Sequence, residues 1–137
     1  MEARGVTMPH VTLLEHQGQP VVKTVFHRMS SIPGLMHVLA ETNQVFKTLE
    51  AGSILSLVRF EGQDFTQAQI DLFEKVARAN ASVVKATAFL GIGGAQVALF
   101  NAMISITNRK AQLFTDEAQA LDWLVEATQE EDLLAGL

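Results

Sequence analysis

The 137-residue sequence contains no cysteine and no tyrosine. Without cysteine, the chain has no disulfide, no thiolate nucleophile and no thiolate ligand for zinc or an iron–sulfur cluster. Basic residues are also few, with 10 Lys and Arg against 15 Asp and Glu and a net charge of -5. Nucleic-acid binding needs concentrated positive charge and stacking aromatic side chains, so the composition argues against a DNA or RNA partner.

Motifs for catalysis and metal binding are missing as well. The four histidines never stand four residues apart and no carboxylate completes a ligand spacing, so neither a metal nor a cofactor is expected. The serines lack the G-x-S-x-G turn of hydrolases, and we expect no enzymatic activity. The first ten residues, MEARGVTMPH, lack the basic start and apolar core of a secretory signal, which favours the cytoplasm.

The sequence does contain an alternation of strand-like and helix-like segments. The length suits one domain over residues 1–137, with loose ends at 1–9 and 130–137. Apolar and β-branched runs predict strands at 11–16, 21–26, 53–60, 82–90 and 111–114. Helical spacing predicts helices over 30–52, 66–80, 95–107 and from 115 onward. The order β-β-α-β-α-β-α-β-α indicates an α/β fold in which helices pack on a mixed, mostly parallel sheet.

Capping residues support these helix starts. Ser30 or Ser31 can cap the first helix, and Thr115 can cap the last. Thr66, with Gln69 three residues later, has the spacing of a capping box.

Two lysines stand inside predicted strands. Strands buried on both faces are expected to be continuously apolar, so Lys23 and Lys85 indicate that part of one sheet face is solvated or meets a partner. The alternative is that both lysines lie at strand ends and extend into solvent.

The most unusual segment is FLGIGGAQVALFNAMISI, residues 89–106, which carries no charge. Its length permits a membrane-spanning helix, but glycines and polar side chains stand inside it, so no membrane span is expected. A dinucleotide-binding fingerprint fails because Gln96 occupies the third glycine position, and no Walker lysine follows. The favoured interpretation is a buried strand, a tight glycine turn and a helix packed against the strand.

The helix after this turn is apolar around most of its circumference, which is more than a surface helix needs. Two explanations remain open, namely burial inside the monomer and burial against a second subunit or an apolar ligand. The second explanation predicts a homo-oligomer with Leu99, Phe100 and Met103 at the interface.

A ligand site is also conceivable beyond the carboxyl ends of the strands, where open α/β sheets bind ligands. The residues that would line this crevice are Arg59, Glu61, Gly91, Gly93 and Gly94. It would take a small apolar or anionic ligand. The alternative is that Arg59 and Glu61 form an ordinary surface salt bridge.

Three stretches resemble a known family. SILSLVRFEGQDF, VARANASVVKATAFLGIGGAQVALFNAMISITNRKAQLF and DEAQALDWL are similar to the STAS fold of anti-sigma-factor antagonists, and specifically to the SpoIIAA-like (STAS/SEC14-type) small bacterial proteins. The resemblance covers Gly52 to Ala127. It implies a non-enzymatic STAS-like domain that acts in regulation or through protein–protein contacts, as a homodimer or with another protein. Similarity to lipid-binding SEC14-type domains implies a lipid-like ligand as the alternative.

The resemblance also identifies one position that could be modified. Sporulation regulators of this fold are switched by phosphorylation of a serine in an Asp-Ser-Ser-Gly-like motif at the start of the helix after the third strand. Here that place reads DFTQAQ, in which Asp64 and Thr66 are present but the serine pair and the glycine are absent. Thr66 is the corresponding position, and its interpretation as a helix cap argues against a phosphorylation switch.

Overall fold

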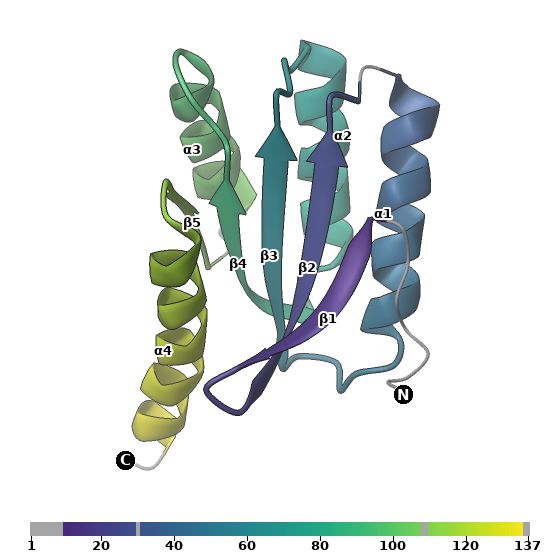
Figure 1. Cartoon of the computed structure of the whole chain (residues 1–137). Helices are drawn as coiled ribbons and strands as arrows, with labels where there is room; N and C mark the ends of the chain where they lie inside the picture. Colours follow the sequence, from purple (N-terminus) through teal and green to yellow (C-terminus); the bar gives the residue numbers. More distant parts are fainter. Residues whose placement is uncertain (1–9, 30, 108–109, 136–137) are drawn as a thin grey trace.

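The computed structural model describes residues 10–29, 31–107 and 110–135, where four helices pack on a five-stranded sheet (Figure 1). The predicted loose start at 1–9 lies outside the described residues. The strands are β1 (Val11–His16), β2 (Gln19–His27), β3 (Ile54–Glu61), β4 (Val84–Leu90) and β5 (Ala111–Phe114). The helices are α1 (Ile32–Phe46), α2 (Gln67–Ala79), α3 (Gln96–Thr107) and α4 (Glu117–Ala135). The predicted α/β class and element order are confirmed.

The sheet order β1-β2-β3-β4-β5 follows the chain, with β1 antiparallel to β2 and the other neighbours parallel. Because right-handed crossovers then all turn the same way, α1, α2 and α3 cover one face, and α4 covers the other (Figure 1). Alternating side chains divide the core accordingly. The buried residues of the α4 face are Val21, Leu55, Leu57, Ala86, Ala88, Leu90, Ala120, Leu124 and Ala127.

A phenylalanine cluster occupies the carboxyl half of the opposite face. Its members are Phe26, Phe60, Phe65, Phe73, Phe89 and Phe100. The ring of Phe60 is central, with centroids of the five other rings between 4.8 and 6.3 Å away. Aromatic pairs at such distances add to the free energy gained by burial alone. This cluster therefore fixes α2 and α3 on the sheet.

The glycine turn between β4 and α3 touches the same cluster. Gly91 has a φ of 86°, and a Cβ atom there would lie 1.9 Å from the backbone oxygen of Phe60. Only glycine permits both this backbone conformation and this approach. Gln96, at the start of α3, donates a hydrogen bond to the backbone oxygen of Phe65 over 3.5 Å. The turn thus has the structural role that the sequence favoured.

Helix ends differ from the predictions in three places. α1 ends at Phe46 instead of Gly52, because the backbone N–H groups of Thr48 and Leu49 bond three residues back in a tighter turn. Asp116, not Thr115, caps α4, since its Oδ1 accepts the N–H of Ala118 at 2.8 Å. α4 also continues to Ala135, past the predicted loose end at 130.

The other caps are as predicted. Ser31 caps α1 by accepting the N–H of Gly34, with Pro33 in the first turn. Thr66 and Gln69 form a complete capping box at α2. Among the described residues, no helix is both long enough and apolar enough to cross a bilayer.

An irregularity in β4 determines where its side chains point. Ile54 of β3 pairs with Val84, but the next residue, Leu55, pairs with Ala86. Lys85 is therefore the extra residue of a β-bulge, which explains a lysine inside this strand.

We expect Gly91→Ala to lower the free energy of unfolding by more than about 2 kcal/mol, because it combines a positive φ with a backbone clash. Gly93→Ala is the matched control, since nothing lies within 4 Å of a Cβ at that position. Urea denaturation of both variants measures the difference, and equal stability would contradict this role of Gly91.

Candidate functional site

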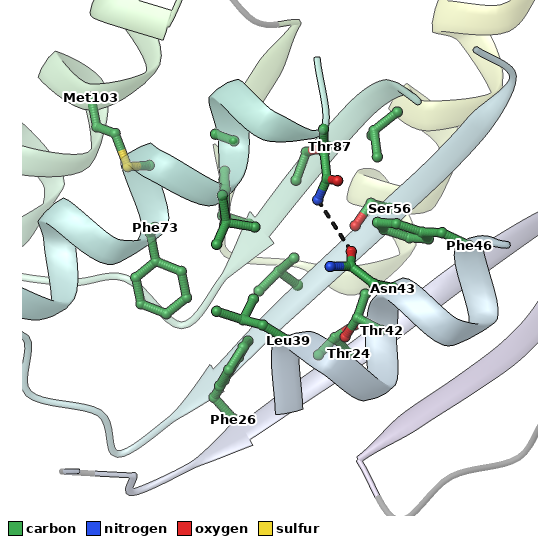
Figure 2. A pocket seen from close by; sticks show the side chains of 16 residues that line it. Thr24, Phe26, Leu39, Thr42, Asn43, Phe46, Ser56, Phe73, Thr87 and Met103 are labelled. Atoms are coloured by element: carbon green, nitrogen blue, oxygen red, sulfur yellow. Dashed lines mark hydrogen bonds between the residues drawn. The ribbon is translucent and has the colours of Figure 1, made fainter. Parts of the chain in front are cut away.

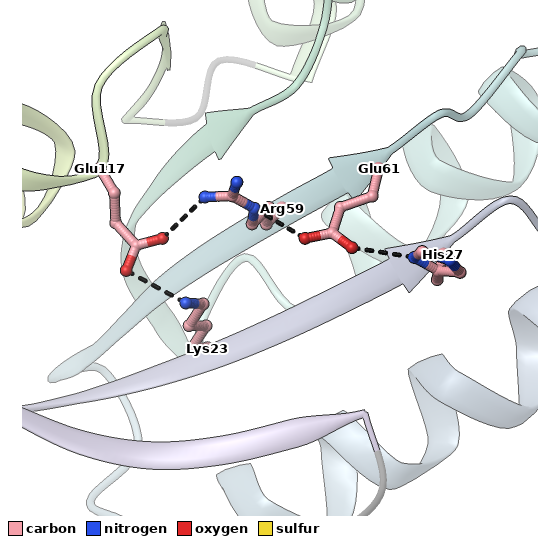
Figure 3. A network of polar contacts seen from close by, with 5 residues as sticks. All are labelled: Lys23, His27, Arg59, Glu61 and Glu117. Atoms are coloured by element: carbon pink, nitrogen blue, oxygen red, sulfur yellow. Dashed lines mark hydrogen bonds and ion pairs between the residues drawn. The ribbon is translucent and has the colours of Figure 1, made fainter.

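A chain of charged side chains crosses the α4 face at the carboxyl ends of β2 and β3 (Figure 3). Glu117, the first residue of α4, accepts hydrogen bonds from Lys23 Nζ and Arg59 Nη1, both at 3.1 Å. Arg59 Nε donates to Glu61 at 3.0 Å, and His27 Nδ1 lies 2.8 Å from the other oxygen of Glu61. Glu117 pairs with Lys23 of β2 and with Arg59 of β3, which ties the start of α4 to two strands.

This network accounts for the charged residues that the sequence placed here. Arg59 and Glu61 form the salt bridge expected as the alternative to a ligand crevice. The hydrogen bond from His27, followed by that from Arg59, lowers the pKa of the Glu61 carboxyl below its ordinary value. Lys23 pairs with Glu117, which explains its place inside a strand. Exposed pairs of this kind contribute little stability individually, so orientation of α4 is their main effect.

The remaining predicted site residues take no part in the hydrogen bonds of this network. Gly91 lies against Phe60, whereas a Cβ at Gly93 or Gly94 would meet nothing within 4 Å. Thr66 Oγ1 accepts the N–H of Gln69 at 3.3 Å as a helix cap. Thr66 thus has the capping role that, in the sequence, argued against a phosphorylation switch.

The three predicted interface residues of α3 divide between core and surface. Phe100 and Met103 are 0% and 4% exposed and pack in the phenylalanine cluster. Leu99 is 44% exposed. The apolar arc is therefore only partly buried inside the monomer, since Phe100 and Met103 are its buried residues. Of the three predicted interface residues, only Leu99 is available to a second subunit.

A pocket lies on the opposite face of the sheet, between α1 and α2 (Figure 2). It has a cavity volume of about 80 Å³, several times the roughly 10–15 Å³ that one water needs. Its lining is mostly apolar and consists of Thr24, Phe26, Leu39, Thr42, Asn43, Phe46, Ser56, Val58, Phe73, Val76, Ala77, Asn80, Val84, Thr87, Phe89 and Met103. None of the five residues predicted for a ligand crevice is among them.

The size of the floor residues explains why the pocket exists. In the carboxyl half of this face, large phenylalanine rings fill the space beneath the helices. In the middle of the sheet, the inward positions of β2, β3 and β4 hold Thr24, Ser56 and Thr87 instead, between this cluster and a further apolar cluster at the amino ends of the strands. α2 packs against α3, but no comparable contact joins α1 to α2. Small floor residues beneath two separated helices leave unfilled volume.

Polar groups in the pocket come from both helices and from the floor. Asn80 Nδ2 donates to Asn43 Oδ1 at 3.4 Å, which links the carboxyl ends of α2 and α1. Thr24 and Thr42 share a hydrogen bond of 3.0 Å, and Thr42 Oγ1 also donates to the backbone oxygen of Val38. No charged side chain lines the pocket.

The sequence contained a signal for this pocket that motif searching does not detect. Ser56 interrupts the apolar run of SILSLVRF, and Thr24 and Thr87 stand likewise in strands otherwise rich in apolar residues. Small polar residues at inward strand positions mark a place where the core is not filled by side chains. Within the described residues, no group of three or more histidine or acidic side chains is arranged to hold a metal ion.

Comparison with known proteins supports the fold. No family profile matches the chain, and no curated protein matches it significantly. The chain is similar to the crystal structure of an uncharacterized protein of the DUF3478 family with a SpoIIAA-like fold from Shewanella loihica PV-4, with a TM-score of 0.58 and 21% identity. The match covers 86% of this chain and 97% of that one. The SpoIIAA-like fold that the sequence resemblance implied is confirmed.

We expect His27→Ala to raise the pKa of Glu61 toward the ordinary glutamate value, since the hydrogen bond to His27 is the main cause of the lowered pKa. The stability that Glu61 contributes is present above its unfolded-state pKa and is lost as the pH falls through the lowered folded-state pKa. NMR titration of the carboxyl carbon measures the shift. His16→Ala is the control, because His16 pairs with Asp122 instead, and an unchanged pKa in His27→Ala would refute the assignment.

Proposed function

We propose that this SpoIIAA-like domain binds a small, mostly apolar molecule in the pocket between α1 and α2. The observation that carries the proposal is an apolar cavity that contains a few inward polar groups. Pockets of this kind are the usual sites of small-molecule binding. The proposal keeps the predicted ligand-binding role but moves it from the Gly91–Gly94 turn to the face of the sheet that α1 and α2 cover.

The surroundings of the pocket support this proposal. Met36 is 54% exposed and stands one turn before Leu39 on α1, so it extends the apolar lining toward the surface. A large exposed apolar side chain beside an apolar cavity favours a ligand that is partly covered at the mouth. Binding, not catalysis, is proposed because the lining combines apolar groups with neutral hydroxyl and amide groups and contains no acid, base or charged group.

Toluene is a suitable first probe, because it is apolar and small enough for part of it to enter the cavity while the rest remains at the pocket opening. We expect it to shift the amide NMR signals of the lining residues in the wild-type protein. Ala77→Phe places a ring in the lining and should abolish these shifts. Ala79→Phe, at an exposed position of the same helix, should leave them unchanged. Shifts that persist in Ala77→Phe would show that toluene binds elsewhere.

Self-association through α3 is a second candidate function. Leu99 and Ile106 are 44% and 59% exposed and stand two turns apart on the same side of the helix. This exposed apolar pair supports the predicted homodimer, although Phe100 and Met103 do not contribute to its surface.

If α3 mediates a dimer, the Leu99→Glu, Ile106→Glu double variant should be monomeric at micromolar concentration where the wild type is dimeric. Sedimentation velocity measures the state of each. Met36→Glu, which changes an exposed residue of α1, is the control and should remain dimeric. A wild-type protein that sediments as a strict monomer would rule out this candidate.

A further inference from the structure

We propose that the pocket selects an uncharged ligand whose hydroxyl or carbonyl group hydrogen-bonds to Ser56 on the pocket floor. This inference rests on the proposed function and specifies the chemical class of the ligand. It depends on two observations, namely a buried hydroxyl without a hydrogen-bond partner among the described residues and a pocket lining without charge.

The hydroxyl of Ser56 is the group that a ligand would satisfy. Ser56 is 4% exposed and lines the pocket from the middle of the sheet (Figure 2). Within the described part of the chain, its Oγ forms no side-chain hydrogen bond. The Oγ is also not one of the fully enclosed polar atoms that lack a partner. A buried hydroxyl that faces a cavity is normally bonded to protein, water or a ligand.

Most of the other polar groups in the pocket already have hydrogen-bond partners in the protein. Thr42 donates its proton to Val38, so in the contact between Thr24 and Thr42 the donor is Thr24. Both threonine protons are therefore used. Asn43 and Asn80 bond to each other. Ser56 thus remains as the deeply buried hydroxyl able both to donate and to accept.

Thr87 stands next to Ser56 and adds a second hydroxyl group to the pocket floor. The two residues are register partners on β3 and β4, and both line the pocket. Neighbouring strands lie about 4.8 Å apart, so one oxygen atom of a ligand can reach both hydroxyl groups. A hydroxyl or carbonyl oxygen matches this pair, because either can accept from one side chain and a hydroxyl can also donate to the other.

The lining also excludes a charged group at this depth. None of its sixteen residues is ionisable, and the network that contains Arg59 and Lys23 lies on the other face of the sheet. Moving a carboxylate or phosphate from water to such a site without a paired cation is strongly unfavourable. The ligand therefore enters the floor with a neutral group.

The cavity volume sets the size of the buried part. At about 80 Å³ it is roughly half the 150 Å³ of an apolar cavity that holds benzene. The floor therefore takes the neutral polar group and the few carbon atoms next to it, while the remaining apolar part of the ligand extends beyond this volume along the apolar lining of α1 and α2.

Three probes of similar size and different polarity test this inference: toluene, benzyl alcohol and benzoate at pH 7. Dissociation constants are measured for each by NMR titration of the intact protein. We expect benzyl alcohol to bind most tightly and benzoate at least roughly a hundredfold more weakly, since its charge cannot be buried here. Benzoate binding as tightly as benzyl alcohol would overturn the inference.

Ser56→Ala tests the hydrogen bond itself, because it keeps the cavity and removes the hydroxyl. We expect benzyl alcohol to bind this variant roughly three- to tenfold more weakly, with toluene affinity unchanged. Ser105→Ala, at an exposed position of α3, is the control and should alter neither. An unchanged benzyl alcohol affinity in Ser56→Ala would refute the role of Ser56 while leaving the pocket intact, whereas no binding of any probe to the wild type would refute the proposed function as well.

Discussion

The ring of Phe60 is the contact on which the arrangement of this domain depends. Through five neighbouring rings it joins β2, β3 and β4 to α2, α3 and the segment before α2. The backbone of the same residue receives Gly91 so closely that no side chain fits there. The position of α3, the glycine turn and the end of β3 therefore all depend on the packing around Phe60. The burial of Phe100 in that cluster accounts for one side of the apolar arc of α3, whereas Leu99 and Ile106 remain exposed.

The two faces of the sheet differ in the side chains that they carry. On one face, α4 is oriented by a row of paired charges, each of which already has its counterion. On the other face, aromatic rings fill the carboxyl half, and small polar residues next to them, beneath α1 and α2, leave a pocket. A binding role follows more naturally from this pocket than from the charged network, because unfilled volume and uncommitted hydrogen-bonding groups occur there together.

Much of the fold could be predicted from the sequence, because hydrophobic periodicity and capping chemistry are local signals. The capping box at Thr66 and the brief strand β5 lie where they were expected. The predicted end of α1 at Gly52 was wrong, because the residues directly after Phe46 already leave the helix in a tight turn. The pocket was missed because it depends on which strand residues become neighbours. Ser56 and Thr87 are thirty-one positions apart and meet only through strand pairing.

The bulge in β4 has a consequence for the pocket floor. Val84 and Thr87 both line the cavity although an odd number of positions separates them, which strict alternation would place on opposite sides of the sheet. The additional residue Lys85 brings the two side chains to the same face of the sheet. The composition of the floor thus depends on the number of residues in β4 as well as on their identity. In related chains, a single insertion or deletion near this point would exchange the residues of the pocket floor without any substitution, so the lining of the pocket can change while the fold is retained.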